Sequence, residues 1–263
     1  QGQVLLDGDE LQPALQKRKR SELQKIQFVF QMADTALNPR QRIDHILGRP
    51  LGFYLGLKGQ EKRRRVLELL DMVELPQDFA GRYPEELSGG QKQRVNLARA
   101  LAASPEVLLC DEVISALDSI VGANVIELLK RLRKQTGVSF VFISHDLSTI
   151  ASFADKIVVL YAGRVVEQGT ADHVLSPPYH PYTRLLISSV PELRVGWLEE
   201  TMQTQEAQAG IDRVVTLTAV GCPFFDRCPL AIKDTCDRET PPVRQLNGEH
   251  TIECHRSEAE FLQ

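Results

Sequence analysis

The sequence predicts an α/β fold: a parallel sheet with a helical subdomain and a small cysteine-containing C-terminal tail. Val107–Cys110 is a short continuous apolar run, typical of a parallel strand buried on both faces. Val138–Ile143 and Lys156–Tyr161 are two further runs of this kind, and helical stretches separate all three. This alternation of strand and helix predicts right-handed crossovers within one parallel sheet.

The remaining elements follow from local pattern. Gln3–Leu6 is interpreted as a strand, and so is Lys25–Gln31, where polar and apolar residues alternate before an apolar run. Arg40–Ala103 has a helical pattern that glycines and prolines interrupt. After the apolar run Val107–Cys110, a helix is expected to begin at its N-cap Asp118 and to stop at Gly137.

Composition limits the classes of function. Apolar residues make up 43% of the 263 residues and charged residues 25%, the balance of an ordinary globular protein. The longest apolar runs are too short to cross a bilayer, so we expect any action at a membrane to involve partner proteins. The formal net charge of -4 argues against nucleic-acid binding. The chain starts at Gln1 instead of Met, inside a strand-like segment, and we interpret it as a piece of a longer protein.

A glycine-rich segment, Leu87–Gln91 (LSGGQ), precedes a helical stretch. Gly89 and Gly90 allow the backbone to come close to a ligand. The unpaired amides at a helix start attract anions. The segment therefore predicts phosphate binding, and the alternative is that Ser88 simply caps a surface helix.

Two acids and a histidine follow predicted strands. Asp111 and Glu112 come directly after a buried run, at the end of the strand where α/β sheets bind ligands. In nucleotide hydrolysis, one acid at this place holds Mg²⁺ and the next orients the attacking water. His145 follows the next strand, and one strand–helix–strand unit of about 30 residues separates it from Glu112. We therefore expect both at one edge of the sheet; an acidic loop end and a surface histidine are the alternatives.

Together these motifs resemble those of the ATP-binding cassette (ABC) ATPases. LSGGQ at 87–91 is similar to the signature motif of that family, and LLCDE at 108–112 is similar to its Walker B strand. Ser115–Asp118 resembles the D-loop, His145 the switch histidine and Gln31 the Q-loop glutamine. The resemblance implies a P-loop NTPase-like fold and an ATPase that uses ATP and Mg²⁺.

The resemblance also implies a role for each residue. Glu112 and His145 are the implied catalytic residues: Glu112 polarises the attacking water, and His145 holds this water in line with the γ-phosphate. Asp111 supports Mg²⁺, and Gln31 senses Mg²⁺ and the γ-phosphate. The implied nucleotide-binding residues are Gln31, Ser88, Gly89, Gly90, Gln91, Asp111 and Asp118. Those of the signature motif and Asp118 are expected to act across a dimer, toward ATP held by the opposite cassette.

The sequence departs from the family pattern at two places. The Walker A loop, GxxxxGK[ST], cradles the β- and γ-phosphates and occurs nowhere in the sequence. We therefore expect this chain alone neither to bind ATP tightly nor to hydrolyse it. Val113-Ile114 stands where the family has Pro-Thr or Ala-Thr, which leaves open whether this cassette's own site is fully active.

Two segments, Ala36–Arg40 and Ser176–Arg184, resemble those of oligopeptide and dipeptide importers. They imply an ATPase subunit at the cytoplasmic face of a bacterial inner membrane. Its implied partners are a second cassette, two permease subunits and, indirectly, a solute-binding protein. The solute itself is not implied, because nickel, opine and some sugar importers share these segments. The alternative for the second segment is a proline-ordered turn that leads into a helix.

The resemblance suggests a domain organisation and leaves rival functions open. The expected parts are an ABC domain at 1–190 with a helical subdomain at about 32–103, a linker at 191–220 and a C-terminal extension at 221–263. One rival is a soluble ABC ATPase of translation or DNA repair without a membrane partner. The other is a non-catalytic cassette that serves only the site of its partner.

The tail contains four of the five cysteines: Cys222, Cys228, Cys236 and Cys254. Their spacing lacks the paired C-x-x-C knuckles usual for zinc, and a cytosolic location disfavours disulfides. Four thiolates in a loop-rich tail suit an iron–sulfur cluster. Related subunits of dipeptide importers resemble this pattern and bind a four-iron cluster; zinc and free thiols are the alternatives. Cys110 lies inside a strand and is interpreted as a small buried hydrophobe.

Overall fold

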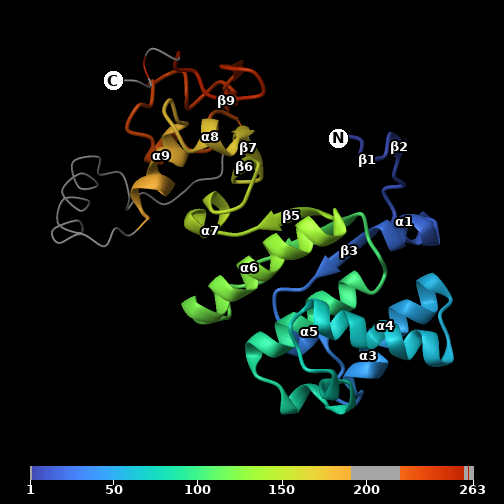
Figure 1. Cartoon of the computed structure of the whole chain (residues 1–263). Coiled ribbons are helices and arrows are strands. Elements are labelled where there is room, and N and C mark those ends of the chain that lie inside the picture. The colour runs from blue at the N-terminus through green and yellow to red at the C-terminus, as the bar shows by residue number, and fades with distance from the viewer. Residues whose placement is uncertain (1, 191–219, 258–259, 261–263) are drawn as a thin grey trace. The chain divides into compact units, whose positions relative to one another are not determined.

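The computed structural model describes residues 2–190, 220–257 and 260. The chain divides into two compact units, Gln1–His145 and Asp146–Gln263 (Figure 1). In the described ranges, no helix combines the length and the apolar character needed to cross a membrane. The fold is mixed α/β and contains a parallel sheet, so the predicted fold class is confirmed.

The first unit is built on a three-stranded sheet with the order β3-β4-β5. The strands are β3 (Ile26–Val29), β4 (Val107–Asp111) and β5 (Ser139–Ile143). The central strand β4 is parallel to both neighbours. Because all three strands run in the same direction, their carboxyl ends meet at one edge of the sheet.

Helix α6 (Ser119–Thr136) forms the crossover between β4 and β5. At its start, the Asp118 carboxylate accepts a hydrogen bond from the Val121 N–H at 3.0 Å. It ends at Gly137, whose φ of 70° lies in the left-handed region that glycine adopts without strain. The sequence predicts both ends of this helix, and the structure confirms them.

The chain between β3 and β4 is helical, as predicted. The elements there are α2 (Ala33–Ala36), α3 (Ile43–Leu55), α4 (Gly59–Met72), η2 (Gln77–Gly81), η3 (Pro84–Glu86) and α5 (Gly89–Leu101). Helices α3, α4 and α5 lie together in Figure 1 and contact one another. Ile43, Leu47 and Leu51 of α3 are fully buried, because a spacing of four residues places them on one face of the helix.

The N-terminal strand is shorter than predicted. Gln3–Leu6 contributes only β1 (Leu5–Leu6), which forms a small antiparallel hairpin with β2 (Asp9–Glu10). The turn residues Asp7 and Gly8 both have positive φ, as a two-residue hairpin turn requires. The short elements η1 (Leu15–Lys17) and α1 (Arg20–Lys25) then lead into β3.

Two predictions about strands are wrong. Val138–Ile143 is not buried on both faces, because within the described residues β5 is an edge strand: Val141 and Ile143 are 49% and 51% exposed. Lys156–Tyr161 does not join the parallel sheet. It forms β6, which pairs antiparallel with β7 (Arg164–Thr170) because only the two-residue turn Ala162-Gly163, with φ of 49° and 77°, connects them.

The second unit contains an antiparallel sheet with the order β6-β7-β9-β8. Its other elements are α7 (Leu147–Ala151), α8 (Ala171–Val174), α9 (Pro181–Ser188), η4 (Phe225–Arg227), β8 (Val243–Gln245) and β9 (Thr251–Glu253). Strand β9 pairs with β7, so the predicted C-terminal extension shares a sheet with residues of the predicted ABC domain. Positions 191–219 of the predicted linker lie outside the described residues. The predicted domain boundaries stay a prediction.

Candidate functional site

Glu112 occupies the turn that follows β4. Its φ of 45° lies in the left-handed region, which costs a non-glycine residue roughly 1–2 kcal/mol. Two hydrogen bonds of 2.9 Å hold this conformation: the Glu112 N–H donates to the Ile143 carbonyl, and the Ser115 hydroxyl donates to the Glu112 carbonyl. Backbone strain of this kind gathers at functional sites, where the surrounding structure fixes the direction of a side chain.

Two side chains contact the Glu112 carboxylate, one at each oxygen. Gln31 Nε2 donates to Oε2 at 2.7 Å, and His145 Nδ1 lies 3.0 Å from Oε1. Gln31 follows β3 and His145 follows β5, so the parallel strands bring all three residues to one edge of the sheet. The prediction that Glu112 and His145 share this edge is confirmed. The His145 side chain is 74% exposed and that of Glu112 30%, so water and ligands can reach both.

Asp111 is the last residue of β4 and is half-buried. In the described part of the chain, no group of three or more His, Cys, Asp or Glu side chains is arranged to hold a metal ion. Magnesium is usually bound through one or two carboxylates together with substrate phosphates and water. The Asp111 carboxylate and the Gln31 amide oxygen are ligand types that suit Mg²⁺, so these residues fit an ion shared with phosphate.

The signature segment (Leu87–Gln91) forms the N-terminus of α5. Ser88 is exposed and caps the helix: its Oγ accepts from the Gln91 N–H at 3.4 Å, and Gln91 Oε1 accepts from the Ser88 N–H at 2.9 Å. The interpretation of Ser88 as a cap is therefore confirmed, and its exposure is compatible with phosphate binding as well. A Cβ on Gly90 would lie 2.5 Å from Val121 Cγ1 of α6. The structure thus places this segment against α6, the helix that Asp118 caps.

The two residues that depart from the family pattern, Val113 and Ile114, pack within the first unit. Val113 is only 3% exposed, and Ile114 contacts the α6 helix near Gly122, where an added Cβ would lie 3.8 Å from Ile114 Cβ. Cys110 in β4 is fully buried, and this burial raises the pKa of its thiol to about 12. The interpretation of Cys110 as a small buried hydrophobe is confirmed.

The four tail cysteines are free thiols that lie close enough to influence one another electrostatically. The Ile232 N–H donates to Cys236 Sγ at 3.3 Å. Burial raises the thiol pKa to about 11 in Cys222 and about 12 in Cys228. Within the described residues no group of three or more His, Cys, Asp or Glu side chains is arranged to hold a metal ion, and this holds for the four tail cysteines as well.

Sequence reasoning missed a buried polar cluster in the second unit. Glu167 is 1% exposed, and burial raises its pKa. Its two carboxylate oxygens contact His250 Nε2 at 2.8 Å and the His180 N–H at 3.0 Å. His180 Nδ1 accepts from the Tyr182 N–H at 3.1 Å and caps α9, which begins at Pro181. The importer-like segment that contains His180 thus forms a proline-ordered turn into a helix.

Sequence reasoning also missed three polar residues of α5 that contact the chain around Gln31. Gln93 and Asn96 are buried, and Arg99 is partly buried. The available signal was their spacing of three residues, which places polar side chains on one side of a helix whose other positions are largely apolar.

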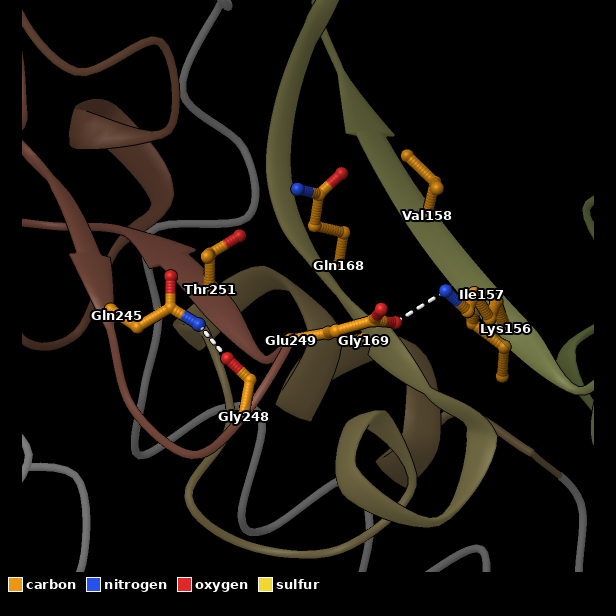
Figure 2. A pocket seen from close by; sticks show the side chains of 9 residues that line it. All are labelled: Lys156, Ile157, Val158, Gln168, Gly169, Gln245, Gly248, Glu249 and Thr251. Carbon is orange, nitrogen blue, oxygen red and sulfur yellow. Dashed lines mark hydrogen bonds and ion pairs between the residues drawn. The ribbon is translucent and has the colours of Figure 1, made fainter.

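A hollow of about 460 Å³ lies on the sheet of the second unit (Figure 2). Gln168 of β7 and Thr251 of β9 line it, and Lys156 of β6 forms an ion pair with Glu249 at its side. No residue of the predicted site lines this hollow. It is therefore distinct from the candidate site around Glu112.

Nucleotide hydrolysis is the chemistry that suits the edge around Glu112, so fold and site define a nucleotide-hydrolysing α/β protein. A family model described as ABC transporter matches residues 1–115, and one described as oligopeptide/dipeptide transporter, C-terminal region, matches residues 166–236. A putative peptide import ATP-binding protein of Brucella abortus is 40% identical over 255 residues, which cover 97% of this chain and 74% of the relative. The chain therefore belongs to the ABC transporter ATPases of the oligopeptide/dipeptide transporter group.

Further comparisons agree with this family. The dipeptide transport ATP-binding protein DppF of Haemophilus influenzae is 38% identical over 96% of this chain and 74% of its own length. The oligopeptide transport ATP-binding protein AppF of Bacillus subtilis is 35% identical over 97% of this chain and 77% of its own length. A dimeric post-hydrolysis structure of the ATP-binding cassette MJ0796, bound to ADP and Pi, matches with a TM-score of 0.54 and 36% identity, over 65% of this chain and 74% of that one. The resemblance inferred from the motifs is confirmed.

Proposed function

We propose that this chain is part of an ATPase that powers the import of peptides, and that it supplies the hydrolytic edge of the sheet around Glu112. Tight binding of ATP needs a Walker A loop as well, which the sequence does not contain. The observation that carries the proposal is the Glu112 carboxylate held between Gln31 and His145, at 2.7 and 3.0 Å. A carboxylate fixed by two neighbours, with its side chain 30% exposed, can accept a proton from a water that lies beside it.

Each residue of the site has a distinct proposed role. Glu112 orients and polarises the attacking water, and His145 fixes the Glu112 carboxylate and contacts the γ-phosphate. Asp111 and Gln31 hold Mg²⁺, which neutralises charge on the phosphates when it is bound. Because Gln31 contacts the Glu112 carboxylate directly, its proposed sensing of Mg²⁺ and γ-phosphate reaches the catalytic carboxylate without an intermediate residue.

The signature residues Ser88, Gly89, Gly90 and Gln91, together with Asp118, are proposed to face ATP bound by a second cassette. The exposure of Ser88 and Gly89 supports this proposal, and so does the dimeric state of the similar cassette MJ0796. The start of a helix offers unpaired amides that suit a phosphate. Each ATP would then lie between the Glu112 edge of one subunit and α5 of the other.

Peptide transport requires partners, which we infer from the relatives. Those described above carry the names of peptide, dipeptide and oligopeptide transport ATP-binding proteins. We propose that this chain works with two permease subunits at the cytoplasmic face of the inner membrane, and that a solute-binding protein delivers the peptide to them. The domain boundaries that fit this proposal are an ABC domain at 1–190 with a helical subdomain at about 32–103, a linker at 191–220 and an extension at 221–263.

The tail is proposed to hold a four-iron cluster through Cys222, Cys228, Cys236 and Cys254. The proximity of the four thiols to one another supports it. The hydrogen bond from the Ile232 N–H to Cys236 Sγ also supports it, because such bonds stabilise thiolates and tune cluster potentials. The alternatives are zinc, which also takes four thiolates, and free thiols without a metal.

Replacing Glu112 with Gln in the complete reading frame, assembled with its partners, tests the catalytic proposal. ATP binding should persist while turnover falls by about 10²–10⁴-fold, the usual contribution of a positioned general base. Glu106→Gln is the matched control, because Glu106 lies just ahead of β4 and forms an ion pair with Lys25 instead. Unimpaired turnover of the Glu112→Gln variant would contradict the assignment.

A further inference from the structure

Beyond Val29 the sheet no longer fixes the chain that leads to Gln31, because the pairing of β3 with β4 ends there. The next carbonyl, that of Phe30, is held by helix α5 instead. Asn96 Nδ2 donates to it at 3.0 Å, and Gln93 Nε2 lies 3.5 Å from the same oxygen. Asn96 is 0% exposed and Gln93 3%. The backbone next to Gln31 is therefore held from the interior of the first unit.

Arg99 completes this set, which we name the α5 clamp (Gln93, Asn96 and Arg99). Its Nη2 donates to Asn96 Oδ1 at 2.9 Å, and its Nη1 donates to the carbonyl of Ala36, at the end of α2. The Arg99 guanidinium also lies over the ring of Phe30, 5.4 Å from its centroid. The α5 clamp thus holds the backbone on both sides of Gln31, before it at Phe30 and after it at Ala36.

The contacts of the α5 clamp connect two parts of the site. Gln31 donates to the Glu112 carboxylate of its own subunit. Ser88 caps helix α5, which begins at Gly89, and Asn96 lies two turns further along the same helix. A displacement of the helix start therefore moves the donor that holds Phe30, since an α-helix transmits motion along its axis as one rigid element.

We propose that Asn96 is a positioning residue for Gln31: it fixes the Phe30 carbonyl so that the Gln31 amide reaches Glu112, and it links this contact to the signature helix. The inference rests on the proposed function, because it assigns Asn96 an effect only through Gln31. A purely structural role would require no more than a satisfied carbonyl. If Asn96 acts by positioning Gln31, removing Asn96 lowers kcat only through Gln31. Replacing Asn96 should then have no further effect on kcat once Gln31 has been removed.

The decisive experiment is a double-mutant cycle in the complete subunit assembled with its permease partners. Asn96→Asp keeps the size of the side chain and the oxygen that accepts from Arg99, but it removes the donor to Phe30. We expect kcat for ATP to fall about tenfold, with KM for ATP within about twofold, because the lost contact acts on the catalytic carboxylate and not on nucleotide binding. Combining it with Gln31→Ala should lower kcat no further than Gln31→Ala alone.

Arg94→Ala is the matched control. Arg94 lies on the same helix but donates to the Val73 carbonyl at 3.1 Å and to Glu74 at 2.8 Å, away from the α5 clamp. The fold reduction in kcat caused by Arg94→Ala should multiply with the fold reduction caused by Gln31→Ala. If the effects of Asn96→Asp and Gln31→Ala also multiply, or if Asn96→Asp keeps full kcat, the inference is wrong.

Two further outcomes separate this inference from the proposed function. Full turnover by Gln31→Ala would overturn the proposed role of Gln31 and the inference with it, whereas multiplying effects would overturn the inference alone.

If Asn96→Asp does not fold, Arg99→Lys serves in the same cycle, because lysine cannot bridge Asn96 and the Ala36 carbonyl with a planar fork. Amide exchange at residues 31–36 should then become faster in Arg99→Lys than in Arg94→Ala, and equal rates would overturn the inference.

Discussion

Gly90 of α5 faces Val121 of α6 so closely that an added Cβ would lie 2.5 Å from Val121 Cγ1. The neighbouring Gly89 is different, because a Cβ there would lie 3.8 Å from Leu117 Cδ2, an ordinary contact distance. The lack of a side chain at Gly90 is thus required by helix packing within this chain, independently of any nucleotide. This packing is a reason for glycine at position 90 that is separate from the proposed contact with nucleotide.

Gly90→Ala should lower the free energy of unfolding by about 1–3 kcal/mol, the usual cost of overpacking a close contact. Urea unfolding of this chain without nucleotide measures the change. Gly89→Ala is the control and should be neutral or slightly stabilising, because alanine is a better helix former. Adding Val121→Ala to Gly90→Ala should restore most of the lost stability. If the double variant is no more stable than Gly90→Ala alone, the contact between positions 90 and 121 is not the cause of the loss.

The proximity of Glu112 and His145 could be predicted from the sequence, whereas the contact between Gln31 and Glu112 is seen only in the structure. Glu112 and His145 each follow a predicted parallel strand, and parallel strands place their carboxyl ends at one edge. Gln31 is identified only through the resemblance to the Q-loop, as the last residue of the strand predicted at Lys25–Gln31. The α5 clamp could not be predicted, because the partner of a buried polar side chain such as Asn96 depends on which loop the tertiary fold brings to it. The helical period shows that Asn96 shares a face with Gln93, but not that the face meets the Phe30 carbonyl.

The pairing of β6 was mispredicted for a related reason. An apolar run such as Lys156–Tyr161 indicates a strand, but it does not show which strand lies next to it. The two-residue turn Ala162-Gly163 connects this strand to β7 as an antiparallel hairpin. The burial of His180 likewise depends on Glu167 and on His250, which lies 83 positions from Glu167. Only contacts between distant residues show that this histidine is a structural one.

Asp118 combines a capping contact with its proposed role across the dimer, and two substitutions separate them. Asp118→Asn should keep the cap of α6, because asparagine is an equally good N-cap, whereas Asp118→Ala should cost about 1 kcal/mol. Thermal or urea unfolding measures this difference. If the residue also acts across the dimer through its charge, Asp118→Asn should lower ATP turnover while stability stays unchanged. Equal turnover in wild type and Asp118→Asn would leave capping as its only role.

Metal analysis tests the proposed iron–sulfur cluster of the tail. Anaerobically purified protein should contain about four iron and four acid-labile sulfide per chain. Cys236→Ser should lose both, because it removes one of the four proposed thiolate ligands. Cys110→Ser is the matched control and should keep the cluster, since Cys110 lies buried in β4. Zinc without iron in the wild-type protein would reverse the proposal.

His180 should make the stability of the second unit depend on pH. Burial lowers its pKa from 6.5 to about 4, so the folded state favours the neutral imidazole that caps α9. Its contribution to stability is therefore fully present above about pH 6.5 and is lost as the pH falls toward 4, by up to about 3 kcal/mol. Glu167 acts in the opposite direction, because burial raises its pKa and protonation then favours the folded state.

The variant His180→Asn isolates the histidine from Glu167, since asparagine keeps an acceptor for the Tyr182 N–H but does not titrate in this range. Urea unfolding followed by circular dichroism between pH 7 and pH 4.5 gives the stability of both proteins. The advantage of wild type over the variant should shrink steadily as the pH falls, because only the wild-type unfolded state gains a proton at position 180. A difference that stays constant over this range would mean that His180 does not titrate as its burial predicts.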